Sequence, residues 1–157
     1  MKKLCAALMA AAVLVGPLLV GPVGTAAADT ATEPGTSDIK KMVVDNGANA
    51  VVVKLHGTGG RAAVRWVNVK LKGANGVSYT VQGAWYSVDW VDSLERGQRL
   101  VACDGLRIHY RSGYWQFRVP RTCLGRLTDQ VKVSGLIVSP TSAIAGEAGP
   151  TGWVRRG

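Results

Sequence analysis

The sequence has 157 residues, with 19 Lys and Arg against 10 Asp and Glu, which gives a formal net charge of +9. A chain of this length corresponds to about one ordinary domain, which excludes a large multidomain architecture. The excess of positive charge favours anionic partners.

Residues 1–28 have the pattern of a secretory signal peptide. A positively charged start is followed by an apolar run up to Val23 and by the small-residue sequence Ala26-Ala27-Ala28. The alternative is an uncleaved membrane anchor, because the run approaches the roughly 20 apolar residues that span a bilayer. Two Gly-Pro breaks in the run favour cleavage. We therefore expect a secreted, extracellular protein with no membrane segment after cleavage.

Cleavage after Ala28 removes Cys5 and leaves Cys103 and Cys123 in a mature chain with a net charge of +7, because only two charged residues, both lysines, are lost. Export places this pair in an oxidising compartment, so we expect one structural disulfide. No metal site or cofactor is expected, because there is no C-x-x-C spacing and only two histidines are available as partners.

The mature chain divides into a short lead-in and one domain. Residues 29–37 are small, polar and aperiodic, which predicts a flexible lead-in. Residues 38–157 form a succession of short runs rich in Val, Ile, Tyr and Trp, separated by glycine-containing turns, with no apolar stripe of helical period. This pattern predicts an all-β domain of seven or eight strands, and an antiparallel β-sandwich of the immunoglobulin-like kind fits it better than a barrel.

Local sequence patterns predict where the strands and turns of this domain lie. Asn46-Gly47 predicts a tight hairpin turn between strands at 39–45 and 49–56. Residues 84–98 fit no single element, and a helical turn is one option there. In the last strand Gly135 predicts a bulge, because the apolar phase shifts at that residue. The remaining strands are expected at 64–71, 76–83, 99–103, 106–111, 114–120 and 130–138.

The stretch 107–123 alternates apolar and basic side chains. This alternation determines the register of the hairpin that the stretch is predicted to form. With a turn at Ser112-Gly113, a slip of one residue would turn Trp115 and Phe117 outward. The inner pairs are Tyr110 with Trp115, Ile108 with Phe117, and Leu106 with Val119. The outer pairs are Arg107 with Arg118, His109 with Gln116, and Arg111 with Tyr114. Cys103 and Cys123 bracket this hairpin, and their disulfide is expected to stabilise the fold by about 3 kcal/mol.

The outer side of this hairpin is the candidate ligand-binding face. Its residues are Arg107, His109, Arg111, Arg118 and, just beyond the strand, Arg121. Guanidinium groups bind phosphate and carboxylate, so the expected partner is an anionic cell-wall polymer or an acidic protein surface. The alternative is a solvated sheet face whose arginines keep the protein soluble. Because the chain is exported, nucleic acid is not expected as a physiological partner, and we expect a monomer.

Motifs for catalysis are missing from the sequence. It contains neither G-x-S-x-G nor H-E-x-x-H, and the mature chain has no third cysteine, so we expect no enzyme. One alternative is a small carbohydrate-active or other hydrolytic enzyme that uses Asp89, Asp92 and Glu95 in an acidic loop. Another is a secreted inhibitor or toxin-like protein that binds through the hairpin tip or the 139–152 loop.

The segment "RIHYRSGYWQFRVPRTCLG" and the terminal "GWVRRG" also support a resemblance to a known group of proteins. With the early "NG" and "VVV" they resemble, over residues 38–157, a group of small secreted actinobacterial proteins of uncharacterised function. The resemblance implies a single β-sandwich domain with a signal peptide and a cysteine pair around a hairpin. Members of this group carry an Asp-rich segment where this chain has "KLKGANGVSY", so no shared ligand is implied at that edge, and no activity carries over.

Overall fold

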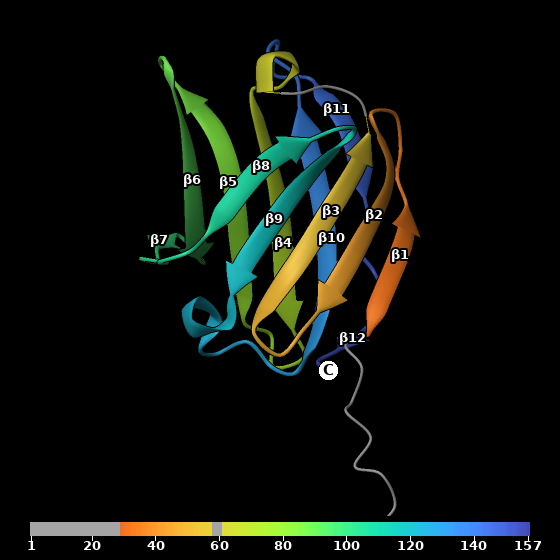
Figure 1. Ribbon diagram of the computed structural model, residues 1–157, viewed down its shortest axis with the longest axis vertical. Coiled ribbons are helices and arrows are strands. Elements are labelled where there is room, and N and C mark those ends of the chain that lie inside the picture. Colours follow the sequence, from red (N-terminus) through yellow and green to blue (C-terminus); the bar gives the residue numbers. More distant parts are fainter. Residues whose placement is uncertain (1–28, 58–60) are drawn as a thin grey trace, which may run out of the picture.

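Two antiparallel sheets face each other in the computed structural model, which describes residues 29–57 and 61–157 (Figure 1). The predicted signal peptide at 1–28 lies outside the described residues. The structure confirms the all-β antiparallel sandwich, with twelve strands in the described part of the chain instead of seven or eight. Among these residues no helix is long and apolar enough to cross a membrane.

Sheet A has five strands in the order β1-β2-β3-β9-β8. Their bounds are β1 Thr30–Pro34, β2 Ile39–Asn46, β3 Ala50–Gly57, β8 Arg107–Arg111 and β9 Tyr114–Pro120. A short 3-10 turn, η2 (Arg121–Leu124), follows β9. The predicted register of the β8–β9 hairpin is confirmed at all five pairs that lie within the two strands. Its turn ends at Gly113, whose φ of +84° suits glycine.

Sheet B is built around the pairing of β10 with β4, in the order β11-β10-β4-β5-β6-β7. Its strands are β4 Trp66–Gly73, β5 Ser78–Tyr86, β6 Asp89–Arg96, β7 Arg99–Leu100, β10 Gln130–Val138 and β11 Ile144–Ala148. A last short strand, β12 (Val154–Arg155), also pairs with β10, and a 3-10 turn, η1 (Arg61–Ala63), precedes β4.

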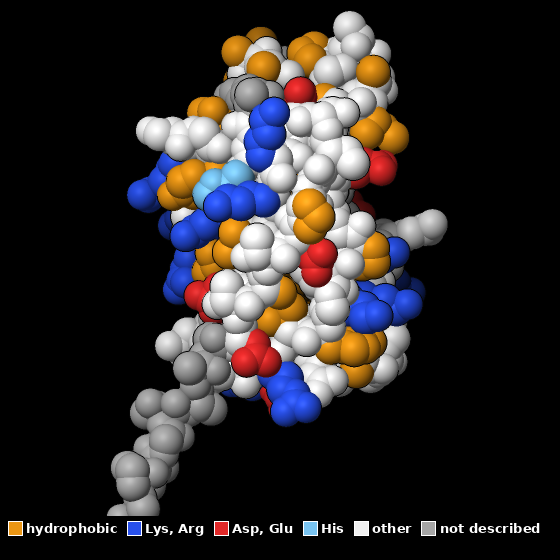
Figure 2. All heavy atoms as spheres, turned by 90° about the vertical axis from the view of Figure 1, so that its right-hand side faces the viewer, with side chains coloured by type: hydrophobic (Ala, Val, Ile, Leu, Met, Phe, Trp, Pro, Cys, Tyr) orange, Lys and Arg blue, Asp and Glu red, His pale blue; other side chains and the backbone are white. Residues whose placement is uncertain are grey.

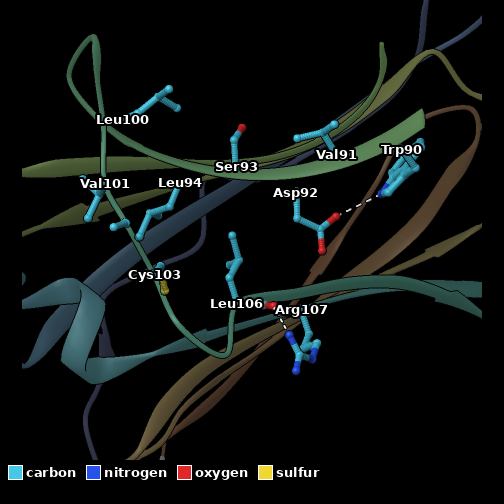
Figure 3. Close-up of a pocket in the computed structure, with 11 residues that line it drawn as sticks. Trp90, Val91, Asp92, Ser93, Leu94, Leu100, Val101, Cys103, Leu106 and Arg107 are labelled. Carbon is cyan, nitrogen blue, oxygen red and sulfur yellow. Dashed lines mark hydrogen bonds between the residues drawn. The ribbon is translucent and has the colours of Figure 1, made fainter. Parts of the chain in front are cut away.

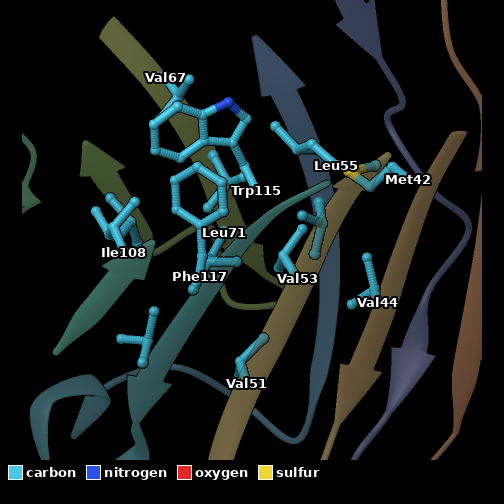
Figure 4. Close-up of a cluster of buried hydrophobic side chains, with 14 of the residues drawn as sticks. Met42, Val44, Val51, Val53, Leu55, Val67, Leu71, Ile108, Trp115 and Phe117 are labelled. Atoms are coloured by element: carbon cyan, nitrogen blue, oxygen red, sulfur yellow. The ribbon is translucent and has the colours of Figure 1, made fainter. Parts of the chain in front are cut away.

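Apolar side chains from both sheets fill the space between them (Figure 4). Trp115 and Phe117 of β9 are the largest of these fully buried side chains, and Leu55 and Leu71 lie among them. Burial of each such side chain contributes roughly 1.5–3 kcal/mol. The predicted disulfide is confirmed, and it joins Cys103, in the loop before β8, to Cys123 in η2.

Two sequence-based expectations are wrong, and one segment that the sequence left unassigned is a strand. Residues 30–34 of the expected lead-in form an edge strand paired with β2, and Ala31 packs against the core. Residues 89–96, where a helical turn was an option, form strand β6. Gly135 is not a bulge, because its pairing with Val69 continues the register of β10 and β4. A Cβ atom there would lie 2.6 Å from Leu55 Cδ2, so the glycine leaves room for Leu55 of the facing sheet, which would have to shift for any larger residue.

The turn at Asn46-Gly47 also differs from its prediction. The hairpin forms, but its connection runs from Gly47 to Asn49 and Gly47 is not among the described residues with positive φ. Asn46 is fully buried, and its side chain bonds to distant parts of the chain. Local propensity assigns Asn46 to a turn, but tertiary contacts hold its side chain in the interior instead.

Candidate anion-binding face

The outer side of sheet A gathers basic side chains from four strands. The β8–β9 pairs continue into β3, because Gln116 pairs with Lys54 and Tyr114 pairs with His56. The next pairing, of β3 with β2, sets His56 beside Lys41. We call this surface the basic face and define it by Lys41, Lys54, His56, Arg107, His109, Arg111 and Arg118. In Figure 2 Lys and Arg side chains line the left margin beside a histidine, where the outer side of sheet A lies.

The cations of the basic face have no carboxylate partner. Residues 29–57 and 61–157 contain one ion pair, between Arg156 Nη1 and Asp129 Oδ1, which lie 3.3 Å apart. Arg118 makes no hydrogen bond to the described residues, and its exposed side chain is directly opposite Arg107 in the cross-strand register. Like charges in directly opposite positions are destabilising, so an anion between these two arginines would relieve a repulsion.

His109 and Arg111 form a hydrogen-bonded pair on β8. Arg111 Nε donates a hydrogen bond of 2.7 Å to His109 Nε2. This bond requires a neutral His109 with its proton on Nδ1. The other guanidinium N–H groups of Arg111 form no hydrogen bond to the described residues, so they remain available to a ligand.

The pKa of His56 is lowered by burial and in part by the positive potential of the basic face. Burial lowers its pKa from 6.5, and the positive charges of Lys41 and Lys54 lower the pKa further. Its ring lies 5.1 Å from the ring of Tyr114, and Lys54 Nζ lies 5.7 Å from the centre of the Tyr114 ring. His56 is therefore neutral at pH 7, and a positive field acts on it.

The lowered pKa of His56 predicts a loss of stability in mild acid. Below pH 6.5 the unfolded chain binds a proton at His56 more readily than the folded chain does, so stability falls as the pH decreases through that range. His56→Gln removes this contribution. We expect its melting temperature to fall less than that of the wild type between pH 7.5 and pH 5. If the melting temperatures of the two proteins fall equally with pH, His56 does not cause this loss of stability.

Arg121 lies apart from the basic face. Its Nε donates a 3.3 Å hydrogen bond to the Gly47 carbonyl, and a terminal nitrogen donates to Asn46 Oδ1. Burial and the neighbouring Arg156 lower its pKa, while Asp129 opposes that effect. Of the five candidate residues, the structure thus brings Arg107, His109, Arg111 and Arg118 together and places Arg121 under the β2–β3 connection.

Three residues of the basic face were not among the sequence candidates. Lys41, Lys54 and His56 belong to the first hairpin, far from 107–121 along the chain. Alternation along 49–56 does assign Lys54 and His56 to one side of their strand. The pairing of β3 with β9, which joins the two groups, has no local signal in the sequence.

The acidic residues of the alternative prediction are not arranged as an acid–base pair. Asp92 Oδ1 accepts a 3.0 Å hydrogen bond from Trp90 Nε1, and Oδ2 accepts one of 2.9 Å from the Ile108 backbone N–H. Asp89 and Glu95 alternate with Asp92 along β6 and point to the opposite side of the sheet. Among the described residues no group of His, Cys, Asp and Glu is arranged to hold a metal ion. Asp92 instead connects the edges of the two sheets.

Comparison with known proteins identifies no relative. No protein-family model, no curated protein and no solved structure matches the chain. What the protein binds is therefore inferred from the chemistry of its own surface.

Proposed function

We propose that this chain is a secreted, non-enzymatic β-sandwich that binds an anionic polymer of the cell surface through the basic face. The observation that supports this most directly is the set of Lys and Arg side chains on β2, β3, β8 and β9 that no described carboxylate neutralises. A soluble sheet face needs charge, but it does not need a large excess of one sign. On β2, β3, β8 and β9 this side of the sheet carries five Lys and Arg side chains and one carboxylate, that of Asp45. This excess of positive charge favours an anionic partner.

The spread of the cations favours a polymer over a small ion. Neighbouring strands lie about 4.8 Å apart, so four strands place cations across about 14 Å. A small anion would contact one or two of these side chains, whereas a chain of phosphates or carboxylates would contact most of them at once. Each guanidinium presents a planar fork of N–H donors that suits either group.

The expected site of action is outside the cell. A disulfide between Cys103 and Cys123 is compatible with an oxidising compartment. A secreted protein that binds wall polymers by charge alone would be held loosely and released by salt, because screening weakens exposed charge interactions.

The double variant Arg107→Glu/Arg118→Glu tests the proposal. We expect it to bind isolated bacterial cell walls about tenfold more weakly than the wild type at low salt, because two attractive contacts become repulsive. Its affinity should also vary less with salt concentration. The measurement is the bound fraction in a pull-down repeated across a salt series.

Lys70→Glu/Lys72→Glu is the matched control, because it makes the same change in net charge on exposed residues of β4 in the other sheet. It should retain most of the wild-type affinity. Equal losses in both double variants would mean that only net charge matters. Unchanged binding in the Arg107→Glu/Arg118→Glu variant would refute the basic face as the binding site.

A further inference from the structure

Two aromatic rings lie among the cations of the basic face. Tyr114 of β9 pairs with His56 of β3, and the centres of their rings lie 5.1 Å apart. Arg111 lies opposite Tyr114 in the β8–β9 pairing, and Lys41 lies beside His56 in the β2–β3 pairing. We call these four residues the aromatic row. Because neighbouring strands lie about 4.8 Å apart, the row crosses four strands over about 14 Å, with a cation at each end and the rings between them.

The ring of Tyr114 is accessible from solvent, since this residue is only half-buried. Lys54 Nζ lies 5.7 Å from the centre of the ring, so the ring is also part of the positive surface. A polymer that is bound by charge alone needs no ring at this position. An aromatic side chain presents a flat apolar surface. The C–H groups of a sugar ring pack against such a surface, so Tyr114 favours a ligand that contains sugar rings.

Neutral polar groups lie beside the two rings. Gln116 follows Tyr114 on the same side of β9 and is half-buried, and its side-chain amide makes no hydrogen bond to the described residues. His56 is neutral at pH 7, so its ring has one N–H donor and one acceptor nitrogen. Sugar hydroxyl groups both donate and accept hydrogen bonds, as the amide and the neutral imidazole do, whereas carboxylates only accept. These two side chains therefore suit the hydroxyl groups of a sugar.

A hollow of ≈ 220 Å³ adjoins the aromatic row at Lys54. Its lining combines two apolar side chains with a hydroxyl, a carboxylate and an ammonium group: Val43, Val52, Thr30, Asp45 and Lys54. Binding sites for small ligands are concave, with apolar surface and a few placed polar groups. The hollow thus offers a place on the basic face for a neighbouring sugar unit.

A larger hollow of ≈ 730 Å³ lies off the basic face, between β6 and the start of β8 (Figure 3). Leu94, Val101 and Leu106 are part of its lining, and Arg107 is the one Lys or Arg among the residues that line it. Asp92 also lines this hollow, and its two carboxylate oxygens already accept hydrogen bonds from within the chain. Apolar side chains and a carboxylate suit an anionic sugar less well than the aromatic row does.

We propose that the polymer bound by the basic face is an acidic polysaccharide of uronic acid units, whose sugar rings pack on Tyr114 while their carboxylates bind Arg111 and Lys41. The assignment rests on the proposed function, because it names the chemical class of the polymer. Each uronic acid unit carries its carboxylate directly on the ring, so a ring on Tyr114 keeps the charge close to the neighbouring strand. The terminal N–H groups of Arg111 form a fork that suits a carboxylate.

Two soluble polyanions distinguish the contribution of the sugar ring from that of charge. Polygalacturonate carries one carboxylate on each sugar ring, and polyglutamate carries one carboxylate on each residue without a sugar. We expect the purified protein to bind polygalacturonate about tenfold more tightly than polyglutamate of equal chain length at the same low salt concentration. The reason is that packing on Tyr114 and hydrogen bonds to Gln116 add to the charge contacts. Isothermal titration calorimetry measures both affinities.

Tyr114→Leu removes the ring and leaves every charge of the basic face in place. We expect this variant to bind polygalacturonate about tenfold more weakly than the wild type. Its affinity for polyglutamate should be unchanged, which also shows that the variant is folded. Tyr114→Phe should bind both polymers as the wild type does, because it keeps the ring. Tyr86→Leu is the matched control, since Tyr86 is an exposed tyrosine of β5 in the other sheet, and it should also behave as the wild type.

The outcomes separate this assignment from the proposed function. Equal affinities of the wild type for the two polymers would overturn the polysaccharide and leave the basic face as a binding site for anions. Equal losses for both polymers in Tyr114→Leu would do the same, because the ring would then only support Lys54. If Arg107→Glu/Arg118→Glu binds both polymers as tightly as the wild type does, the proposed function fails, and the polysaccharide assignment fails with it.

Discussion

Asn46→Ala is expected to lower the free energy of unfolding by about 3 kcal/mol, because leaving buried polar groups without partners costs about 1–3 kcal/mol each. Asn46 is fully buried, and its Nδ2 donates hydrogen bonds to the carbonyls of Asp129, at 3.0 Å, and Val154, at 2.8 Å. Its Oδ1 accepts a hydrogen bond from Arg121. Alanine would remove all three bonds. Urea denaturation followed by tryptophan fluorescence measures the loss.

The position of Asn46 explains the size of this effect. Its side chain fastens the end of β2 to the segment before β10 and to β12, which are distant in sequence. Asn68→Ala is the control, since Asn68 is a half-buried residue on the outer side of β4 whose side chain makes no hydrogen bond to the described residues. It should change stability by no more than about 0.5 kcal/mol. A similar small loss in Asn46→Ala would show that water replaces its hydrogen bonds.

Removal of the disulfide is the second large effect. We expect Cys103→Ser/Cys123→Ser to lower the free energy of unfolding by about 3 kcal/mol, because the bond closes a loop between residues 20 positions apart. The bond also ties the segment before β8 to η2. Local opening should therefore be greatest near the hollow beside β6, which Cys103 helps to line.

Denaturation with and without a reducing agent checks this prediction. The wild type in reductant should unfold at the same urea concentration as the double serine variant in either condition. Hydrogen exchange of the amides at 101–106 should be faster in the variant. If reductant leaves the wild-type midpoint unchanged although mass spectrometry shows free thiols, the disulfide does not stabilise the fold.

Local alternation was sufficient to predict the part of the site on β8 and β9. Trp115 and Phe117 must both be buried, and the turn at Gly113 is short, so the register of Arg107 and Arg118 followed from adjacent sequence alone. Alternation could not predict which strand lies beside β9. The assignment of Lys54 and His56 to the basic face therefore depends on the pairing of β3 with β9, which the structure shows and local sequence does not.

The wrong predictions have a common physical cause, namely contacts from distant parts of the chain. At Gly135 the apolar phase shift looks like a bulge, but the glycine makes room for Leu55 of the other sheet. At Asn46 a residue typical of turns is held as a buried donor. In β6 the inward-facing Asp92 breaks the apolar alternation, because its carboxylate bonds to Ile108 across the edges of the two sheets.

The topology also determines how the chain must fold. In each sheet a central pairing joins strands from distant parts of the chain, β3 with β9 and β4 with β10. Such long-range pairings require closure of large loops before any contact stabilises them, and domains of this kind fold on the order of milliseconds to seconds. Neither half of the chain can close the core alone. Sheet B is therefore complete only after β10, which is near the C-terminal end of the chain, has paired with β4.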